Sequence, residues 1–316
     1  GKAPRRPRRG ADGLNSMKTS ATNYAACLRQ DILHRAETYV VSRRLEPHVY
    51  RSRGEVPTVL FRAYESGGKP CHGNFHDESF AGITLRPSWV SRLEKPHSGK
   101  RRCFLDCDAS TAREMDSCTS SDALAMNIFC HPSSITNQSL ARIFGFDPLP
   151  EPDFGFKANL PFAVGGMEPR STEVDVRLHS STRTVLAECK LTEPNFTACP
   201  RAHVERYAAF DQTFDVAHLP QKDGQFLHYQ LIRNVLAARH HEASFTLICD
   251  QRRPDLQEAF GTVVSAIVDP RLRLRCSVIT WQQIAATLPM SLQTFLSAKY
   301  GIEGHEDPSG ATDGLG

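Results

Sequence analysis

Residues 171–193 read STEVDVRLHSSTRTVLAECKLTE, and this stretch decides the fold. Apolar and polar residues alternate over residues 174–178 and again over 184–191, which predicts two strands, each with one apolar and one largely polar face. The link HSSTR is short enough for a hairpin centred between Ser181 and Thr182. The simplest interpretation is therefore an antiparallel pair of neighbouring strands.

The centre of the hairpin fixes the predicted register. Residues that face each other across an antiparallel pair have numbers of constant sum, so Asp175 is expected opposite Glu188, and Glu173 opposite Lys190. Directly opposed side chains have Cβ atoms about 5 Å apart. All four of these charged side chains are then expected on one face.

Two facing carboxylates point to a divalent cation. Asp175 and Glu188 would repel each other and raise each other's pKa, a conflict that Mg²⁺ resolves by taking one or two carboxylates and leaving its other positions to water and phosphate oxygens. Lys190 is placed to hold or help deprotonate an attacking water, or to stabilise negative charge in the transition state. These residues are typical of a metal-dependent nuclease, although the same alternation also fits an ordinary half-exposed hairpin.

Outward from this hairpin, the chain alternates helices and strands. Expected helices lie at 22–45, 87–93, 120–130, 201–214, 225–238, 255–268 and 281–300, and expected strands at 56–64, 154–162, 245–249 and 274–280. The Arg271, Arg273 and Arg275 ladder is assigned to the last strand, at a sheet edge. The pattern predicts an α/β (α+β) fold with a mixed central sheet flanked by helices.

Charge and composition divide the chain into four parts. Five of the first ten residues are basic, and without them the formal net charge falls from +3 to −2, so a strong overall basic field gives no argument for nucleic acid. We expect a disordered basic extension (1–20), a helical and loop-rich N-terminal elaboration (21–119), a core (120–302) and a disordered tail (303–316). The sequence has neither a secretory signal nor an apolar run of the roughly 18 residues needed to span a membrane, which favours a cytoplasmic protein with no membrane partner.

Ten cysteines in such a chain favour free thiols over disulfides. Cys103, Cys107, Cys118 and Cys130 with His131 lack the two-residue spacing of a zinc ribbon, so zinc is the less favoured interpretation. His72 and His76 could share a metal on a helix, but Gly73 and Asn74 between them favour a structural turn.

The spacing D-x12-E-x-K, on two adjacent strands, resembles the PD-(D/E)XK (restriction-endonuclease-like) nuclease superfamily. GNFHDESF (73–80), SSDALAMNIF (120–129), AECKLTEPNF (187–196) and QLIRNVLAA (230–238) are similar to a sparsely characterised bacterial branch of restriction-type endonucleases. The resemblance covers about residues 70–290. It departs from the superfamily pattern at one point, because Val174 rather than proline precedes Asp175.

The resemblance implies a restriction-endonuclease-like core, and it assigns roles to particular residues. It implies that Asp175, Glu188 and the carbonyl of Cys189 are Mg²⁺ ligands, with Mn²⁺ as an alternative ion, and that Lys190 is the catalytic lysine. Asp122 matches the acid that many members place on the first core helix, although an acid in a first helical turn is also favoured by the helix dipole.

The helix expected at 225–238 supplies further candidates. Gln230 and Arg233 share a polar stripe with Asn234, and related nucleases use such residues to steady the active site or a DNA phosphate. A solvated helix face explains the same stripe equally well.

The sequence thus predicts a Mg²⁺-dependent DNA endonuclease. The alternatives are a non-catalytic nucleic-acid- or partner-binding module that keeps the fold, and a zinc-stabilised interaction protein. Enzymes that cut both strands of DNA often use two active sites, so a homodimer is a further possibility.

Overall fold

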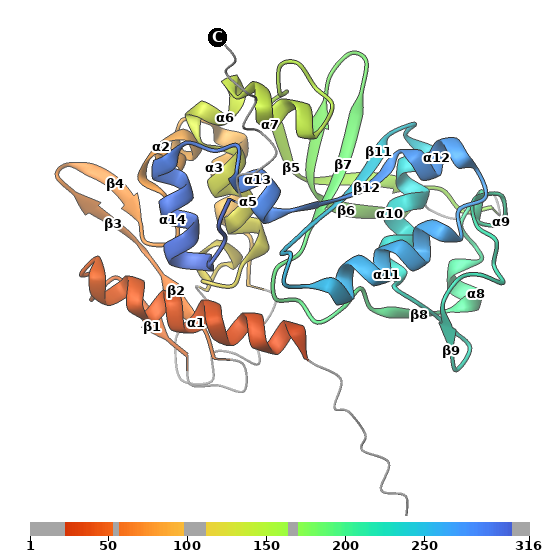
Figure 1. Ribbon diagram of the computed structural model, residues 1–316, viewed down its shortest axis with the longest axis horizontal. Helices are drawn as coiled ribbons and strands as arrows, with labels where there is room; N and C mark the ends of the chain where they lie inside the picture. Colours follow the sequence, from red (N-terminus) through yellow and green to blue (C-terminus); the bar gives the residue numbers. More distant parts are fainter. Residues whose placement is uncertain (1–22, 53–56, 98–111, 164–169, 305–316) are drawn as a thin grey trace, which may run out of the picture.

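The computed structural model describes residues 23–52, 57–97, 112–163 and 170–304. Its centre is a mixed sheet in the order β12-β11-β7-β6-β5, which runs through the middle of Figure 1. The strands of this sheet are β5 (Pro152–Leu160), β6 (Arg170–His179), β7 (Thr184–Cys189), β11 (Ser244–Cys249) and β12 (Cys276–Thr280). Strands β5, β6 and β7 are antiparallel neighbours, whereas β7, β11 and β12 are parallel. The predicted α/β fold with a mixed sheet is confirmed.

The hairpin of β6 and β7 has the predicted register. Its pairs are Val176↔Ala187, Arg177↔Leu186, Leu178↔Val185 and His179↔Thr184. The ladder ends at Val176, so Asp175 lies just beyond its last pair. Glu173, which was expected opposite Lys190, instead pairs with Lys157 of β5.

Strand β6 changes faces next to Asp175. Val176 belongs to the apolar cluster on one side of the sheet and Val174 to the cluster on the other, although strict alternation would put both on one face. Gly155 of β5 lies between the partners of these two valines and has φ +69°, a conformation that glycine adopts readily. The prediction of one unbroken apolar face on β6 is therefore wrong. Asp175 stands at a break in the alternation of β6, although the strand itself is continuous from Arg170 to His179. Such irregularities are common beside active sites.

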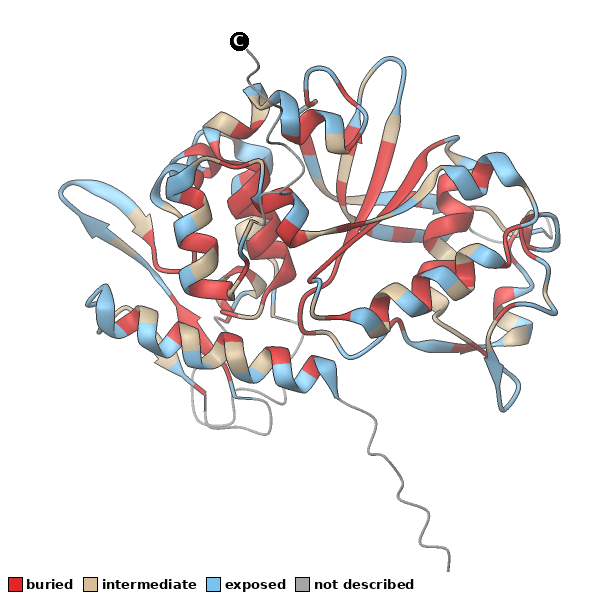
Figure 2. Cartoon of the chain, in the orientation of Figure 1, coloured by how far each residue is buried: buried red, intermediate tan, exposed pale blue. Residues whose placement is uncertain are grey.

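Helices cover both faces of the sheet (Figure 1). Apolar residues of α1, α5, α13 and α14 pack with one face, and those of α10, α11 and α12 with the other. Figure 2 shows the buried positions concentrated on the strands and on the inward sides of these helices. The longer helices are α1 (Tyr24–Ser42), α5 (Ser121–Phe129), α10 (Tyr229–His240), α11 (Pro254–Ser265) and α14 (Met290–Tyr300). The shorter ones are α6 (Pro132–Thr136), α7 (Gln138–Ile143), α8 (Arg201–Val204), α9 (Phe210–Thr213), α12 (Pro270–Leu274) and α13 (Trp281–Ala285).

The N-terminal region packs against α5. Its elements are β1 (Val49–Arg51), β2 (Val59–Phe61), β3 (Ala63–Ser66), β4 (Lys69–His72), α2 (Asp77–Thr84), α3 (Pro87–Leu93) and the 3₁₀ turn η2 (Glu114–Asp116). Phe80 and Trp89 of this region form an apolar cluster with Ala123 and Met126 of α5. This packing places α3 beside the first helix of the expected core.

Four segments differ from the sequence prediction. The helix expected at 201–214 is interrupted at Ala209, whose φ is +61°. Residues 225–227 form β10, which pairs with β8 (Ala198–Pro200) and β9 (Gln221–Lys222), before α10 begins. The expected helix at 281–300 is two helices, because Pro289 starts the second. The expected strand at 56–64 is divided between β2 and β3.

The arginine ladder is also not on a strand. Arg271 and Arg273 lie on α12, which Asp269 caps by accepting the Arg271 N–H at 2.9 Å, and β12 begins only at Cys276. Among the described residues, no helix is both long and apolar enough to cross a membrane.

Candidate active site

Glu188 is the most enclosed acid of the predicted site. Its side chain lies on β7, is 1% exposed and is held by three donors. Oε1 accepts the Gln230 Nε2 amide at 2.5 Å and lies 2.8 Å from the Lys190 Nζ, and Oε2 accepts the Asn234 Nδ2 amide at 2.9 Å. Both amides come from α10, so this helix fixes the orientation of the carboxylate.

Asp175 lies beside this carboxylate at the break in β6. Its Oδ2 accepts the backbone N–H of Cys189 at 2.7 Å, which ties Asp175 to the end of β7. Burial raises the pKa of Asp175 well above its usual range, and the negative charges of Glu188 and Asp122 add to the effect. Lys190 and the Cys189 N–H oppose this rise without cancelling it. The site therefore holds more negative charge than its own cations balance.

Lys190 follows directly after β7. Its backbone N–H donates to the Ile248 carbonyl at 2.8 Å, and its carbonyl accepts the Trp281 indole N–H at 2.9 Å. Burial lowers the pKa of Lys190, but the charge of Glu188, followed by those of Glu193 and Asp175, raises the pKa overall. Lys190 is thus held both by its backbone and by its ammonium group.

Glu193 is a further acid that the sequence analysis did not assign. Its Oε1 accepts the Ser121 hydroxyl and its Oε2 the Leu191 N–H, both at 2.7 Å. The contact with Ser121 links the loop after β7 to the first turn of α5. A signal was present in the sequence, because Glu193 lies only three residues after Lys190.

Asp122, which the resemblance makes a possible metal ligand, is held by two cations of the N-terminal region. Its two oxygens each accept from the Arg92 Nη2 at 3.1 Å, and Oδ2 also lies 2.6 Å from the Lys95 Nζ. Glu173 joins the group, with its Oε1 at 2.8 Å from Arg92 Nη1 and 3.5 Å from Lys95 Nζ. The charge of Asp122 still contributes to the raised pKa of Asp175, so the acid lies near the site, but two cations hold it.

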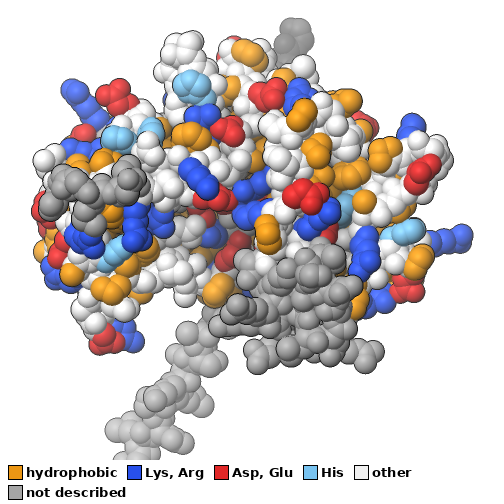
Figure 3. All heavy atoms as spheres, turned by 180° about the vertical axis from the view of Figure 1, so that it is seen from behind, with side chains coloured by type: hydrophobic (Ala, Val, Ile, Leu, Met, Phe, Trp, Pro, Cys, Tyr) orange, Lys and Arg blue, Asp and Glu red, His pale blue; other side chains and the backbone are white. Residues whose placement is uncertain are grey.

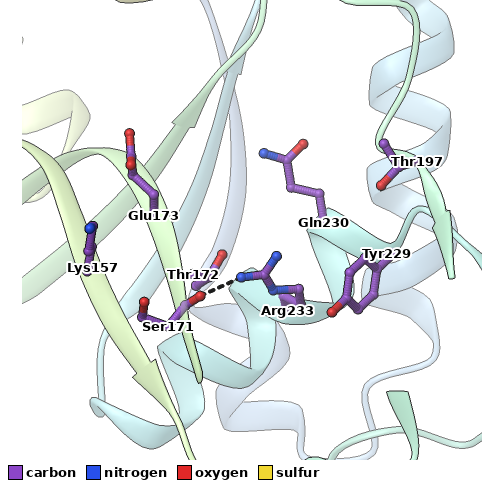
Figure 4. A pocket seen from close by; sticks show the side chains of 8 residues that line it. All are labelled: Lys157, Ser171, Thr172, Glu173, Thr197, Tyr229, Gln230 and Arg233. Carbon is purple, nitrogen blue, oxygen red and sulfur yellow. Dashed lines mark hydrogen bonds between the residues drawn. The ribbon is translucent and has the colours of Figure 1, made fainter. Parts of the chain in front are cut away.

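An open pocket of about 570 Å³ adjoins the site. Its walls come from β5, β6 and α10, with Thr197 directly before β8; they are Lys157, Ser171, Thr172, Glu173, Thr197, Tyr229, Gln230 and Arg233. Figure 4 shows Arg233 reaching from α10 to β6, where it donates to the Ser171 carbonyl at 2.6 Å. Gln230 extends from the same helix towards the gap between α10 and β6 (Figure 4). Because Gln230 also holds Glu188, the pocket is continuous with the predicted catalytic group.

The structure thus brings Asp175, Glu188, Lys190 and Gln230 together. Arg233 lines the adjoining pocket, and the carbonyl of Cys189 stays a predicted ligand. Asn234 was noted in the sequence only as part of a polar stripe, yet it holds Glu188 directly.

The cysteine and histidine candidates lie elsewhere. Cys118 and Cys130 belong to different apolar clusters, and Cys103 and Cys107 lie outside the described residues. His72 Nε2 lies 3.1 Å from Asp116, and residues 73–76 form the turn that was predicted between β4 and α2. Within the described part of the chain, no group of three histidine, cysteine or acidic side chains is arranged to hold a metal. A metal at the predicted site would therefore rely on two carboxylate side chains and the predicted Cys189 carbonyl, with water and substrate as its other ligands.

The surface carries mixed charge. Figure 3 shows basic and acidic side chains interspersed over the face opposite to that of Figure 1. Contacts with a polyanion would therefore depend on local groups more than on a broad basic field.

A mixed sheet covered by helices on both faces, with two acids and a lysine brought together on two neighbouring strands, defines a restriction-endonuclease-like protein. The chain belongs to the family described as Restriction Endonuclease associating with ARP, whose sequence model matches residues 47–301. No curated protein and no solved structure matches the chain. The family match includes the sheet and also the segment that carries Arg92 and Lys95.

Proposed function

We propose that this protein is a metal-dependent endonuclease that hydrolyses phosphodiester bonds in DNA. The observation that carries the proposal is that Asp175, within β6, lies beside Glu188 and Lys190 at the end of β7, with Lys190 in contact with Glu188 and Asp175 hydrogen-bonded to the Cys189 N–H. Membership of a restriction-endonuclease family supports DNA as the substrate.

The donor set fits a hard divalent cation. Asp175 and Glu188 offer carboxylate oxygens, which are the ligands that Mg²⁺ and Mn²⁺ prefer. The raised pKa of Asp175 shows that a second negative charge is unfavourable there, and a bound cation would remove this penalty. In this proposal Asp175, Glu188 and the Cys189 carbonyl hold the ion.

The ion would activate water and polarise a phosphoryl oxygen, which phosphodiester hydrolysis requires. The side chains of the protein orient the reacting groups and balance the charge around the phosphate. Lys190 supplies a fixed positive charge beside Glu188 that can hold the attacking water or stabilise a developing negative oxygen. Gln230 and Asn234 keep the Glu188 carboxylate in one orientation. The water attacks phosphorus in line, so a covalent enzyme intermediate is not required.

The test is incubation of the purified chain with plasmid and with single-stranded DNA, first with Mg²⁺ and then with excess EDTA. Cleavage in Mg²⁺ that stops in EDTA is expected, and Asp175→Asn should abolish it. Absence of cleavage by a folded wild-type protein that binds DNA would favour the non-catalytic binding module instead.

A further inference from the structure

Two cations from the N-terminal region reach into the acidic site. Arg92 lies in the last turn of α3, and Lys95 follows that helix by two residues. Both contact Asp122 of α5 and Glu173 of β6. The arrangement joins three separate parts of the chain at one point beside Asp175.

The charge of Asp122 is already compensated by these cations. The acid is 5% exposed, and its carboxylate is held by both the Arg92 guanidinium and the Lys95 ammonium. A divalent cation placed on it would be repelled by two positive charges. Asp175, by contrast, forms no ion pair with any described residue and accepts a backbone N–H instead. Asp122 is therefore better suited to holding Lys95 and Arg92 than to binding a metal.

The backbone makes room for Arg92. A Cβ added at Gly155 would lie 2.3 Å from the Arg92 Nη1, closer than atoms can approach. Gly155 is also the residue of β5 next to the break that carries Asp175. The absence of a side chain at Gly155 thus leaves space for the Arg92 guanidinium beside β5.

Lys95 is the more accessible of the two cations. Its side chain is 33% exposed, against 11% for Arg92. An ammonium has three N–H donors, and within the described part of the chain two acceptors contact it, Asp122 and Glu173. The third donor has no partner among the described residues, and in the proposal below it contacts a ligand.

A phosphate that approaches this site needs such a cation. Asp122, Glu173, Asp175 and Glu188 would all repel a polyanion at short range. Glu173 also lines the pocket that contains Lys157 and Arg233, so Lys95, through its contact with Glu173, lies next to the wall of this pocket. A DNA strand could contact these cations in succession.

We propose that Lys95 binds a DNA phosphate beside the pair of Asp175 and Glu188, and that Arg92 and Asp122 position Lys95 for this contact. The inference rests on the proposed function and assigns it a phosphate-binding residue supplied by the N-terminal region. Asp122 becomes a positioning residue and not a metal ligand.

The test measures DNA affinity against salt concentration in EDTA, so that cleavage does not interfere. A fluorescein-labelled duplex of about 30 base pairs is titrated with wild type, Lys95→Gln and Lys95→Arg at several salt concentrations. Each phosphate contact contributes about 0.9 to the slope of log K against log salt on duplex DNA. Lys95→Gln should reduce the slope by about one and weaken binding, and Lys95→Arg should restore most of the slope. Lys69→Ala, which removes an exposed lysine of β4, is the control and should keep the wild-type slope.

A second measurement addresses Asp122. Mn²⁺ titration should show little change of affinity, within about threefold, for Asp122→Asn, while Asp175→Asn should lose the site. An unchanged salt slope in Lys95→Gln would overturn the assignment of Lys95, and loss of Mn²⁺ binding in Asp122→Asn would overturn that of Asp122.

The two proposals fail separately. If wild type binds DNA but does not cleave it in Mg²⁺, the nuclease proposal fails and the salt slope still decides whether Lys95 contacts phosphate. If wild type cleaves and the slope of Lys95→Gln matches wild type, the nuclease proposal stands and the assignment of Lys95 is wrong. If wild type does not bind DNA in EDTA, the assignment of Lys95 is wrong, and the nuclease proposal is also wrong if wild type does not cleave DNA in Mg²⁺.

Discussion

Replacing Asp175 by asparagine should stabilise the metal-free protein while removing its response to metal. Two carboxylates about 5 Å apart repel by roughly 3 kcal/mol at an effective dielectric constant of 20. Lys190, which contacts Glu188, and the Cys189 N–H recover part of this energy. We therefore expect Asp175→Asn to raise the free energy of unfolding by about 1–2 kcal/mol in EDTA at neutral pH, in the range found when a strained active site is relieved.

The sign of the pH dependence follows from the raised pKa of Asp175. The folded protein holds this proton more tightly than the unfolded chain, so wild-type stability is greatest at acid pH and falls as the pH rises through the raised pKa. The advantage of Asp175→Asn should therefore grow as the pH rises from the ordinary carboxyl range through the raised pKa of Asp175.

Thermal unfolding in EDTA and in Mg²⁺ provides the assay. In EDTA the variant should melt roughly 2–4 °C above wild type. Mg²⁺ at a hundred times its dissociation constant should stabilise wild type by about 2.7 kcal/mol and leave the variant unchanged, so the order of melting temperatures should reverse. A variant that is less stable in EDTA, or that still gains stability from Mg²⁺, would refute this account of the site.

Three further substitutions test the surroundings of the site. Gly155→Ala should lower the free energy of unfolding by about 1–2 kcal/mol because of the positive φ, and further because the new Cβ collides with Arg92. Gly224→Ala, at φ +73° in open space, is the control and should show only the backbone loss in urea unfolding. Equal losses in the two variants would contradict the contact between Gly155 and Arg92. Asn234→Leu should cost about 1–3 kcal/mol in the same assay, because it leaves one oxygen of buried Glu188 without a donor, and no loss would contradict that hydrogen bond. Burial lowers the pKa of Lys299 well below its usual range, so wild-type stability should fall as the pH drops below about 10, and Lys299→Met should flatten this dependence. An unchanged pH profile in Lys299→Met would contradict the burial of an amino group there.

The sequence predicts the hairpin well because the alternation of the two strands and the length of the link between them indicate the same register. Alternation defines β6 and β7, and the link between them leaves one symmetric pairing, which the ladder from Val176 to His179 follows. The change of faces near Asp175 was not predictable in this way, since it depends on Gly155 in a different strand. Local pattern thus gives the pairing, and a neighbouring strand supplies the irregularity.

Two errors had visible signals. Asp269 and Pro270 form a helix start that outweighs the alternation of the following arginines and leucines, so α12 replaces the expected strand. Pro289 likewise marks the boundary between α13 and α14. In both segments, start and stop residues carried more information than periodicity.

The partners of Asp122 had no such signal. Arg92 is 30 residues away along the chain, and its contact arises because α3 packs beside α5. Periodicity places Asp122 on a helix but does not show which charges meet it. The acid that resembles a metal ligand by position is therefore paired with cations in the folded protein.

The most direct test of the central claim is single-turnover cleavage of an end-labelled DNA duplex by wild type and by Lys190→Met, with Mg²⁺ binding measured for both. Removing one transition-state charge contact of this kind typically lowers the rate 10²–10³-fold. We expect such a loss with Mg²⁺ binding retained, and wild-type cleavage products that carry a 5′-phosphate. Equal cleavage rates for the two proteins, or no Mg²⁺-dependent cleavage by wild type, would contradict it.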